Sequence, residues 1–343
     1  MELRKLGNSG IEVSTIAIGC WPFGGGTYWG EQSQDDVNKV VAGALDSGIN
    51  FFDVAESYNG GASEESLGLA LKGGLREKAV VLSKTNPSRF TLDDTYQAQF
   101  DSRLDAMLKR LQMEYLDVLM VHWPNPEFAR TEALLRAIEG AVESGKVRTI
   151  GISNFGPIQM KEIIDAGLTK YVSVNELQYN LVSRAIETEI LPICIENNFS
   201  VMTYCTLQQG VLTGKYATPD EVPYNQAHSR HFQEFRGNGT SGHSEAGAEK
   251  EIFELLAKMK GMASDLGISM AELSLAWALA RPGITTAIAG CRNLDQLAMN
   301  RKAADIKLSP EVIATLNDWS TPAFVRLGDC ADFFKNREDT RIW

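Results

Sequence analysis

The sequence predicts an α/β protein of the (β/α)8 TIM-barrel class. Eight apolar, β-branched runs alternate with amphipathic segments of helical periodicity. Several runs deliver Asp, Lys or His at their carboxyl ends, and buried strands rarely tolerate these residues without a reason. In a parallel barrel all strands end at one face, where active sites are built. We therefore expect a barrel with a functional site at that face.

The eight runs have the length and composition of buried parallel strands. They lie at residues 15–20, 49–54, 79–84, 117–122, 148–152, 172–177, 200–204 and 284–289. The first gap carries apolar residues spaced by three and four from Val37 to Leu45, and Gly48 ends this pattern. Segments 92–112 and 252–259 repeat the spacing. Alternation of this kind requires a parallel sheet with right-handed crossovers.

An open, doubly wound sheet is the competing architecture. It usually carries Gly-x-Gly-x-x-Gly after its first strand, and the glycines at 24–26 lack that spacing. The length of 343 residues and the hydrophobic content of 44% suit one barrel with extensions. We expect a single domain over residues 1–343.

Two extensions interrupt the alternation. Residues 3–15 read as a β-hairpin with its turn at 7–10, which we expect to plug the amino-terminal mouth of the barrel. Residues 216–247 are rich in Gly, Ser, His and Asn, have no sustained period, and are too long for an ordinary connection. Because this segment follows the seventh strand, we expect a lid over the active face rather than a decorative loop.

Composition excludes several classes of protein. A net charge of −11 and a pI near 5.0 disfavour nucleic acid and anionic membranes as partners. No signal peptide and no apolar run of roughly 20 residues is present, so we expect a soluble, cytoplasmic protein. The cysteines are odd in number and lack Cys-x-x-Cys spacing, which argues against disulfides and a metal site. Oligomeric state stays open.

Each polar residue at a strand end has an ordinary structural explanation when taken alone. Asp53 could cap a helix, Lys84 could extend out of the sheet, and His122 could be a hydrogen-bonded core histidine. Their common placement at the carboxyl ends of predicted strands favours a site instead.

Taken in order, the motifs resemble the aldo-keto reductase superfamily over nearly the whole chain. The resemblance rests on Asp53 followed by Tyr58, on Lys84, on His122, and on the segments 151–155, 175–180 and 210–216. Among its branches, the bacterial or plant-type reductases of sugar aldehydes and inositol-linked metabolites are most similar. The resemblance implies reduction of an aldehyde or ketone by NAD(P)H.

The implied chemistry agrees with the residue types. Hydride arriving at a carbonyl carbon leaves an alkoxide that needs a proton, and Tyr58 is the candidate acid. Free tyrosine has a pKa of about 10. We expect the Lys84 ammonium to lower that value, Asp53 to orient Lys84, and His122 to donate a hydrogen bond to the substrate oxygen.

The resemblance also implies a cofactor site. The expected cofactor residues are Cys20, Trp21, Asp53, Ser153, Asn154, Gln178, Tyr204, Leu207, Gln209, Lys215, Arg230, Gly290, Arg292, Gln296 and Asn300. Tyr204 would stack on the nicotinamide, whereas Arg292 would pair with the 2′-phosphate that separates NADPH from NADH. NADP(H) is therefore the preferred cofactor, and NAD(H) is possible. Met299 departs from the carboxylate that many relatives carry near the adenine.

An aromatic wall would face the substrate. The expected pocket residues are Trp21, Tyr28, Trp29, Tyr58, His122 and Trp123. Such walls suit sugar faces and aromatic aldehydes alike. We expect a hydroxylated, sugar-like carbonyl compound as substrate.

Two other functions remain open. The same scaffold resembles the β subunits of voltage-gated potassium channels, which bind NADPH and act as regulatory partners. A hydrolytic or metal-dependent barrel using Asp53, Glu56 and His122 is the third alternative, but it leaves Lys84 and Tyr58 without a role.

Overall fold

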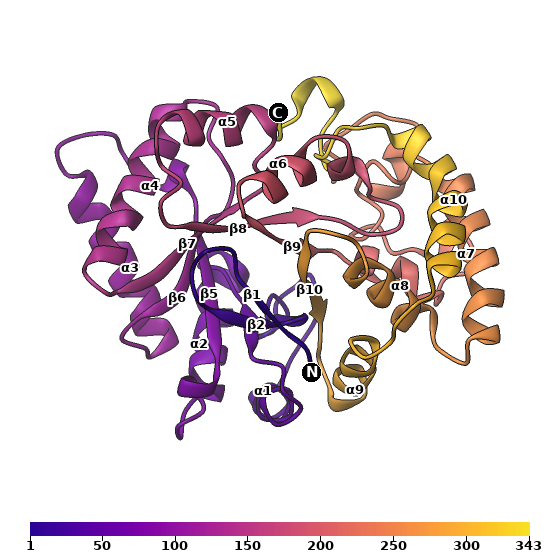
Figure 1. The fold of residues 1–343 in the computed structure, drawn as a ribbon, viewed down its shortest axis with the longest axis horizontal. Helices are drawn as coiled ribbons and strands as arrows, with labels where there is room; N and C mark the ends of the chain where they lie inside the picture. The colour runs from indigo at the N-terminus through magenta and orange to yellow at the C-terminus, as the bar shows by residue number, and fades with distance from the viewer.

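The computed structural model describes residues 1–343 and contains a closed barrel of eight parallel strands (Figure 1). In order around the ring they are β10 (Ile284–Gly290), β3 (Ile16–Gly19), β4 (Phe51–Asp53), β5 (Val80–Thr85), β6 (Leu116–Val121), β7 (Val147–Ser153), β8 (Val172–Gln178) and β9 (Ser200–Tyr204). All strand bounds fall within two residues of the predicted ones. The predicted TIM barrel is confirmed.

Helices surround the barrel as the alternation predicts. They are α1 (Gln34–Asp46), α2 (Ala62–Ala70), α3 (Tyr96–Leu111), α4 (Phe128–Glu143), α5 (Pro157–Asp165), α6 (Ile190–Glu196), α7 (Glu249–Asp265), α8 (Met270–Leu279), α9 (Leu294–Ala303) and α10 (Pro310–Leu327). Two of them, α7 and α10, pack against each other as an addition to the eightfold pattern (Figure 1). None of the helices is long and apolar enough to cross a membrane.

The amino-terminal hairpin closes one end of the barrel. Strands β1 (Leu3–Lys5) and β2 (Glu12–Ser14) pair in antiparallel orientation. Leu6, Ile11 and Val13 are buried and pack with the apolar side chains of the barrel interior. At the turn, Gly7 has φ of +51°, and an added Cβ would lie 2.4 Å from the carbonyl oxygen of Ser173 in β8. Only glycine permits such a close approach, so the turn holds the hairpin against the start of β8.

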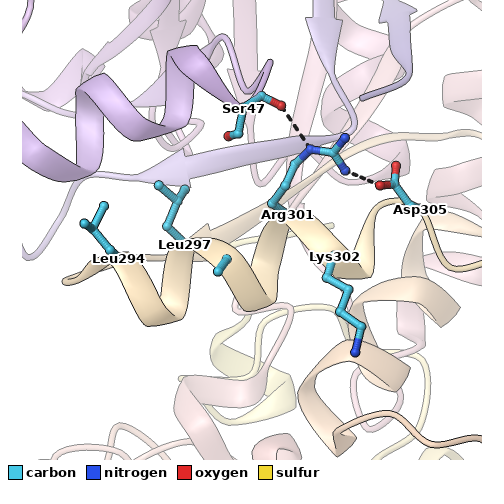
Figure 2. A pocket seen from close by; sticks show the side chains of 7 residues that line it. Ser47, Leu294, Leu297, Arg301, Lys302 and Asp305 are labelled. Atoms are coloured by element: carbon cyan, nitrogen blue, oxygen red, sulfur yellow. Dashed lines mark hydrogen bonds and ion pairs between the residues drawn. The ribbon is translucent and has the colours of Figure 1, made fainter.

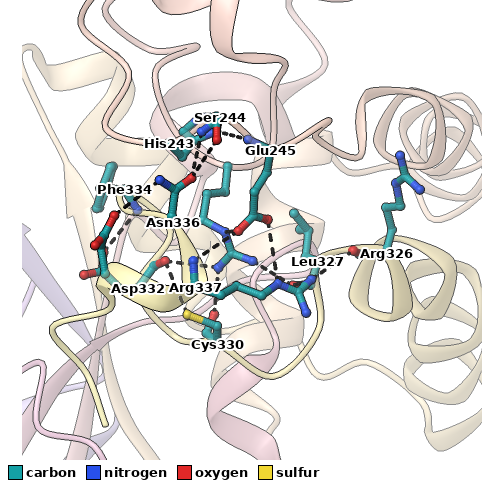
Figure 3. Close-up of polar contacts among 12 residues, drawn as sticks. His243, Ser244, Glu245, Arg326, Leu327, Cys330, Asp332, Phe334, Asn336 and Arg337 are labelled. Atoms are coloured by element: carbon teal, nitrogen blue, oxygen red, sulfur yellow. Dashed lines mark hydrogen bonds and ion pairs between the residues drawn. The ribbon is translucent and has the colours of Figure 1, made fainter.

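The segment 216–247 has no α-helix or strand and is joined to the carboxyl-terminal tail. The Arg230 guanidinium is fully buried and donates to the carbonyl oxygens of Leu327 and Asp332 at 3.0 and 3.1 Å. It also pairs with Glu245 at 2.9 Å, and Glu245 in turn faces Arg337 of the tail, as Figure 3 shows. The two segments thus form one connected unit.

Candidate active site

A cavity of about 610 Å³ lies at the carboxyl ends of the barrel strands. Most of the residues expected from the sequence line it: Trp21, Tyr28, Trp29, Asp53, Tyr58, His122, Trp123, Ser153, Asn154, Tyr204, Leu207, Gln209, Lys215, Gly290, Arg292 and Gln296. The fold gathers them because each follows a strand that ends at this face.

Three polar side chains form a connected group at the base of the cavity. Asp53 ends β4, Lys84 lies in β5, and Tyr58 stands in the short 3₁₀ turn after β4. Lys84 Nζ is buried, donates to Asp53 Oδ1 and lies 3.2 Å from the Tyr58 hydroxyl. The structure therefore contains the contacts of Lys84 with Asp53 and Tyr58 that we expect from the sequence.

The pKa values of Lys84 and Tyr58 differ from those of free side chains. Burial opposes the ammonium of Lys84, but Asp53 and the nearby Glu176 outweigh it and raise the pKa of Lys84. For Tyr58, burial raises the pKa above its usual value of 10, and the Lys84 ammonium offsets only part of that rise. The expected lowering of the Tyr58 pKa is therefore wrong for the protein without ligand, because desolvation of the phenolate exceeds the attraction of Lys84.

Sequence reasoning missed a second carboxylate beside Lys84. Glu176 in β8 is almost fully buried, and its Oε2 lies 3.4 Å from Lys84 Nζ. Burial, together with the charge of Asp53, raises the pKa of Glu176 to about 8. An acidic residue in a predicted buried strand is unusual and could have pointed to Glu176, but its approach to Lys84 depends on the closure of the barrel.

His122 follows β6 at the cavity wall, and its ring centroid lies 6.0 Å from that of Tyr58. Burial, with a smaller contribution from Lys84, lowers the pKa of His122 to about 3. The imidazole is therefore neutral at physiological pH and keeps one N–H donor.

Polar groups on β7 and β9 form the adjoining wall. The Tyr204 hydroxyl donates to Asn154 Oδ1 at 2.8 Å, and Asn154 Nδ2 donates to Ser153 Oγ at 2.9 Å. Asn154 has φ of +64°, a left-handed conformation that a non-glycine residue seldom adopts.

The loop after β9 has an unusual backbone and brings a lysine to the cavity. Gln208, Gln209 and Gly210 are consecutive residues with positive φ. The N–H groups of Gln208 and Gly210 donate to the carbonyl oxygens of Cys205 and Leu207 at 2.7 and 2.9 Å. Lys215 lines the same wall and approaches Gly210 so closely that an added Cβ would lie 2.7 Å from its Nζ. The ammonium of Lys215 is therefore the group of this loop that fits a phosphate.

Arg292, at the far end of the cavity after β10, is held by the first loop of the barrel. Its Nη1 donates to the carbonyl oxygen of Trp29 at 2.7 Å, and its Nε to Gln32 Oε1 at 2.8 Å. Nη2 donates to the carbonyl oxygen of Glu31. A phosphate that paired with this guanidinium would compete with these oxygens.

The expected aromatic wall is present. Trp21 stacks on Tyr28 with centroids 4.8 Å apart and on Tyr58 at 5.7 Å, and Trp29 meets both Trp21 and Tyr28 edge-on. Two residues outside the predicted pocket set complete the wall. His228 of the long loop and Phe334 of the tail line the cavity and stack at 5.4 Å.

Four expected cofactor residues do not line the cavity. Cys20 is fully buried, and the Gln178 amide bonds to Ser183 and Gln208. Asn300 is buried and donates to the carbonyl oxygen of Gly290. The expectation that Arg230 closes over the phosphates is not met, because its guanidinium lies away from the cavity, donates to the carbonyl oxygens of Leu327 and Asp332 and pairs with Glu245. Cys20, Gln178 and Asn300 lie behind the residues that line the cavity, so any effect they have on a cofactor would be indirect.

A second hollow, of about 510 Å³, lies outside the barrel between α1 and α9 (Figure 2). Arg301 crosses it, donating to the carbonyl oxygen of Ser47 and to Asp305. No group of three or more His, Cys, Asp or Glu side chains here or elsewhere is arranged to hold a metal ion. The chemistry is concentrated at the barrel mouth.

Fold and site together define a TIM-barrel protein with a cluster of Tyr, Lys, Asp and His at the carboxyl ends of its strands. The model of the aldo/keto reductase family matches residues 15–320. The chain belongs to the aldo/keto reductase family, and it is an oxidoreductase.

Individual relatives are similar to this chain over most of its length. Aldo-keto reductase YhdN of Bacillus subtilis is 31% identical over 310 residues, covering 87% of each chain. A probable voltage-gated potassium channel subunit beta of Oryza sativa is 31% identical over 91% of this chain and 94% of its own. A crystal structure of an aldo/keto reductase from Klebsiella pneumoniae with NADP and acetate superposes with a TM-score of 0.71 at 27% identity, covering 92% and 94% of the two chains.

Proposed function

We propose that this protein reduces an aldehyde or ketone to the alcohol with NADPH, with Tyr58 as the general acid. The observation that carries the proposal is the contact between Lys84 and Tyr58, 3.2 Å long, at the base of a cavity with a neutral histidine at its wall. A bound nicotinamide would supply hydride to the carbonyl carbon. The protein must then bind the carbonyl, orient it and provide a proton.

In this proposal Tyr58 donates its hydroxyl proton to the substrate oxygen as negative charge develops there. Lys84 stabilises the resulting phenolate, and Asp53 keeps Lys84 protonated in a buried position. The neutral imidazole of His122 donates a hydrogen bond to the same oxygen and so fixes its position. Burial raises the pKa of Tyr58. Proton donation by Tyr58 therefore depends on the negative charge that develops on the substrate oxygen during the reaction.

The cofactor would lie along the wall from β7 to α9. Ser153 and Asn154 would hold the carboxamide, Tyr204 would stack on the ring, and Lys215 would face the pyrophosphate. Arg292 would exchange its loop oxygens for a 2′-phosphate, which supports a preference for NADP(H) while leaving NAD(H) usable. The phosphate-bound form would then differ from the present one in the position of the first loop.

The substrate pocket favours a hydroxylated carbonyl compound. Trp21, Tyr28, Trp29 and Trp123 give flat apolar faces, on which the C–H faces of a sugar can stack. The Tyr28 hydroxyl and the His228 ring add polar groups to this wall. A combination of this kind suits a sugar-like aldehyde better than a purely apolar one.

The test is a fluorescence titration of the purified protein with NADPH and NADH, followed by turnover with aldoses, oxo-sugars and aromatic aldehydes. The proposal expects tighter binding of NADPH and turnover of at least one hydroxylated carbonyl compound. If neither NADPH nor NADH bound, the proposed cofactor site would be overturned.

A regulatory role is the second candidate, because the Oryza sativa relative is named as a potassium channel subunit. Tight NADPH binding without turnover across the whole panel would favour that role. The complete group of Asp53, Tyr58, Lys84 and His122 supports the enzyme instead.

A further inference from the structure

The buried carboxylate of Glu176 has no role in the chemistry described so far. Its Oε2 accepts no hydrogen bond, although it is only 3.4 Å from Lys84 Nζ. Two carboxylates, Asp53 and Glu176, therefore approach one ammonium in a desolvated site. If both were ionised the group would carry a net negative charge, which burial disfavours strongly.

We propose that Glu176 is a positioning residue that sets the acidity of Tyr58 by controlling how much of the Lys84 charge Tyr58 receives. When Glu176 is protonated, Lys84 balances Asp53 alone and can stabilise a phenolate. When Glu176 is ionised, it draws on the same ammonium and adds negative charge near Tyr58. Proton donation then becomes harder. This inference rests on the proposed reductase function.

Few titratable or charged groups surround the carboxyl group of Glu176. Its neighbours in register on β7 and β9 are Ser153 and Met202, which carry no charge. The titratable groups that interact with it electrostatically are Lys84, Asp53, Tyr58, Tyr204 and Cys205. Asp53 stays the ionised member of the pair because it bonds Lys84 directly, although the two carboxylates titrate together.

The ionisation of Glu176 is separated from that of Cys205 and His122, which lie nearby in the same cavity. The pKa of Glu176 is raised to about 8, whereas burial raises that of Cys205 to about 12 and lowers that of His122 to about 3. A loss of reductase activity on raising the pH through about 8 would thus report Glu176. The same raised pKa predicts that Glu176 contributes stability at acidic pH that is lost as the pH rises through about 8.

The experiment compares the pH dependence of kcat and of urea unfolding for the wild type, Glu176→Gln and Glu64→Gln. The glutamine at 176 imitates the protonated carboxyl. Glu64 is equally buried but bonds Ser83 and Arg110 instead of Lys84, so its variant is the matched control. We expect wild-type kcat to fall roughly threefold to tenfold from neutral pH to about 9.5, with the fall retained in Glu64→Gln and absent in Glu176→Gln.

A fall of the same size in Glu176→Gln would overturn the inference and leave Glu176 a structural counter-ion. If the wild type reduces no carbonyl compound, the proposed function fails, and the unfolding data still decide whether Glu176 titrates. In that case, equal slopes of stability against pH near 8 in wild type and Glu176→Gln would overturn the inference as well.

Discussion

The ammonium of Lys84 lies between the carboxylate of Asp53 and the hydroxyl of Tyr58, 3.2 Å from the latter. These residues come from β4, β5 and the turn between β4 and α2, and the parallel pairing of β4 with β5 brings them together. The contact gives Tyr58 the neighbour that a proton donor needs, while burial keeps its pKa high. The balance of these two effects leads to the first prediction.

Replacing Tyr58 by Phe removes the proton donor but no group expected to bind the cofactor. We expect kcat to fall by roughly 10²- to 10⁴-fold, with the dissociation constant for NADPH nearly unchanged. Steady-state kinetics and a fluorescence titration of the same preparation check both parts. Near-native turnover in Y58F would disprove the assignment of the acid.

Replacing Arg292 by Ala tests recognition of the 2′-phosphate. We expect NADPH binding to weaken by about 1.5–3 kcal/mol and NADH binding to weaken less. The KM for the carbonyl substrate should also rise, since Arg292 holds the loop that carries Trp29.

Arg301→Ala is the matched control for Arg292, because Arg301 lies on α9, the helix that follows Arg292, but faces the outer hollow (Figure 2). It should leave both cofactor affinities unchanged. Equal weakening of NADPH and NADH in R292A would show that Arg292 does not distinguish them.

Arg230 should hold the long loop against the tail. Its fully buried guanidinium donates to backbone carbonyl oxygens and pairs with Glu245, so Arg230→Ala leaves several buried acceptors without partners. We expect faster proteolysis within residues 216–247 and a higher KM, because His228 and Phe334 of the pocket belong to these segments.

Arg337→Ala serves as the control for Arg230, since Arg337 contacts the same Glu245 and Leu327 but its side chain is 48% exposed. Its proteolysis rate should stay close to that of the wild type. Indistinguishable rates for R230A and R337A would contradict the anchoring role of Arg230.

Acid should destabilise the protein through its buried histidines. Burial lowers the pKa of His122 and of His231 from 6.5 to about 3. The unfolded chain therefore binds more protons between these values, and this contribution to stability is complete above about pH 6.5 and is lost as the pH falls toward 3. Each histidine should contribute on the order of 3 kcal/mol to the loss between neutral pH and about pH 4.

Urea unfolding over this pH range measures the slope, and His231→Gln should reduce it. His231 is the better choice for substitution because it lies outside the proposed catalytic group, bonded to Ser183 and Ser229. A slope that is the same in wild type and H231Q would contradict the assignment.

The barrel could be predicted because its signals are local. Strand runs, helical spacing and the glycine turn of the hairpin each follow from short windows of sequence, and the strand ends then place Asp53, Lys84 and His122 at one face. Pairing across the barrel could not be predicted in this way. Glu176 lies within a strand, and its approach to Lys84 depends on the closure of the ring.

The contacts of the loop arginines could not be predicted from the sequence, for another reason. Arg230 and Arg292 were both predicted to face phosphates, yet each is bound by backbone carbonyl oxygens of a distant segment. Carbonyl groups carry no signature in the sequence, because every residue has one.

Hydride transfer and proton donation by Tyr58 are tested together with NADPH deuterated at its transferable position and a carbonyl substrate found in the turnover panel. We expect one deuterium at the carbinol carbon of the alcohol, and we expect formation of this alcohol to be nearly abolished in Y58F. Alcohol without deuterium at that carbon, or deuterium transfer at the wild-type rate in Y58F, would contradict the proposed reduction with Tyr58 as its proton donor.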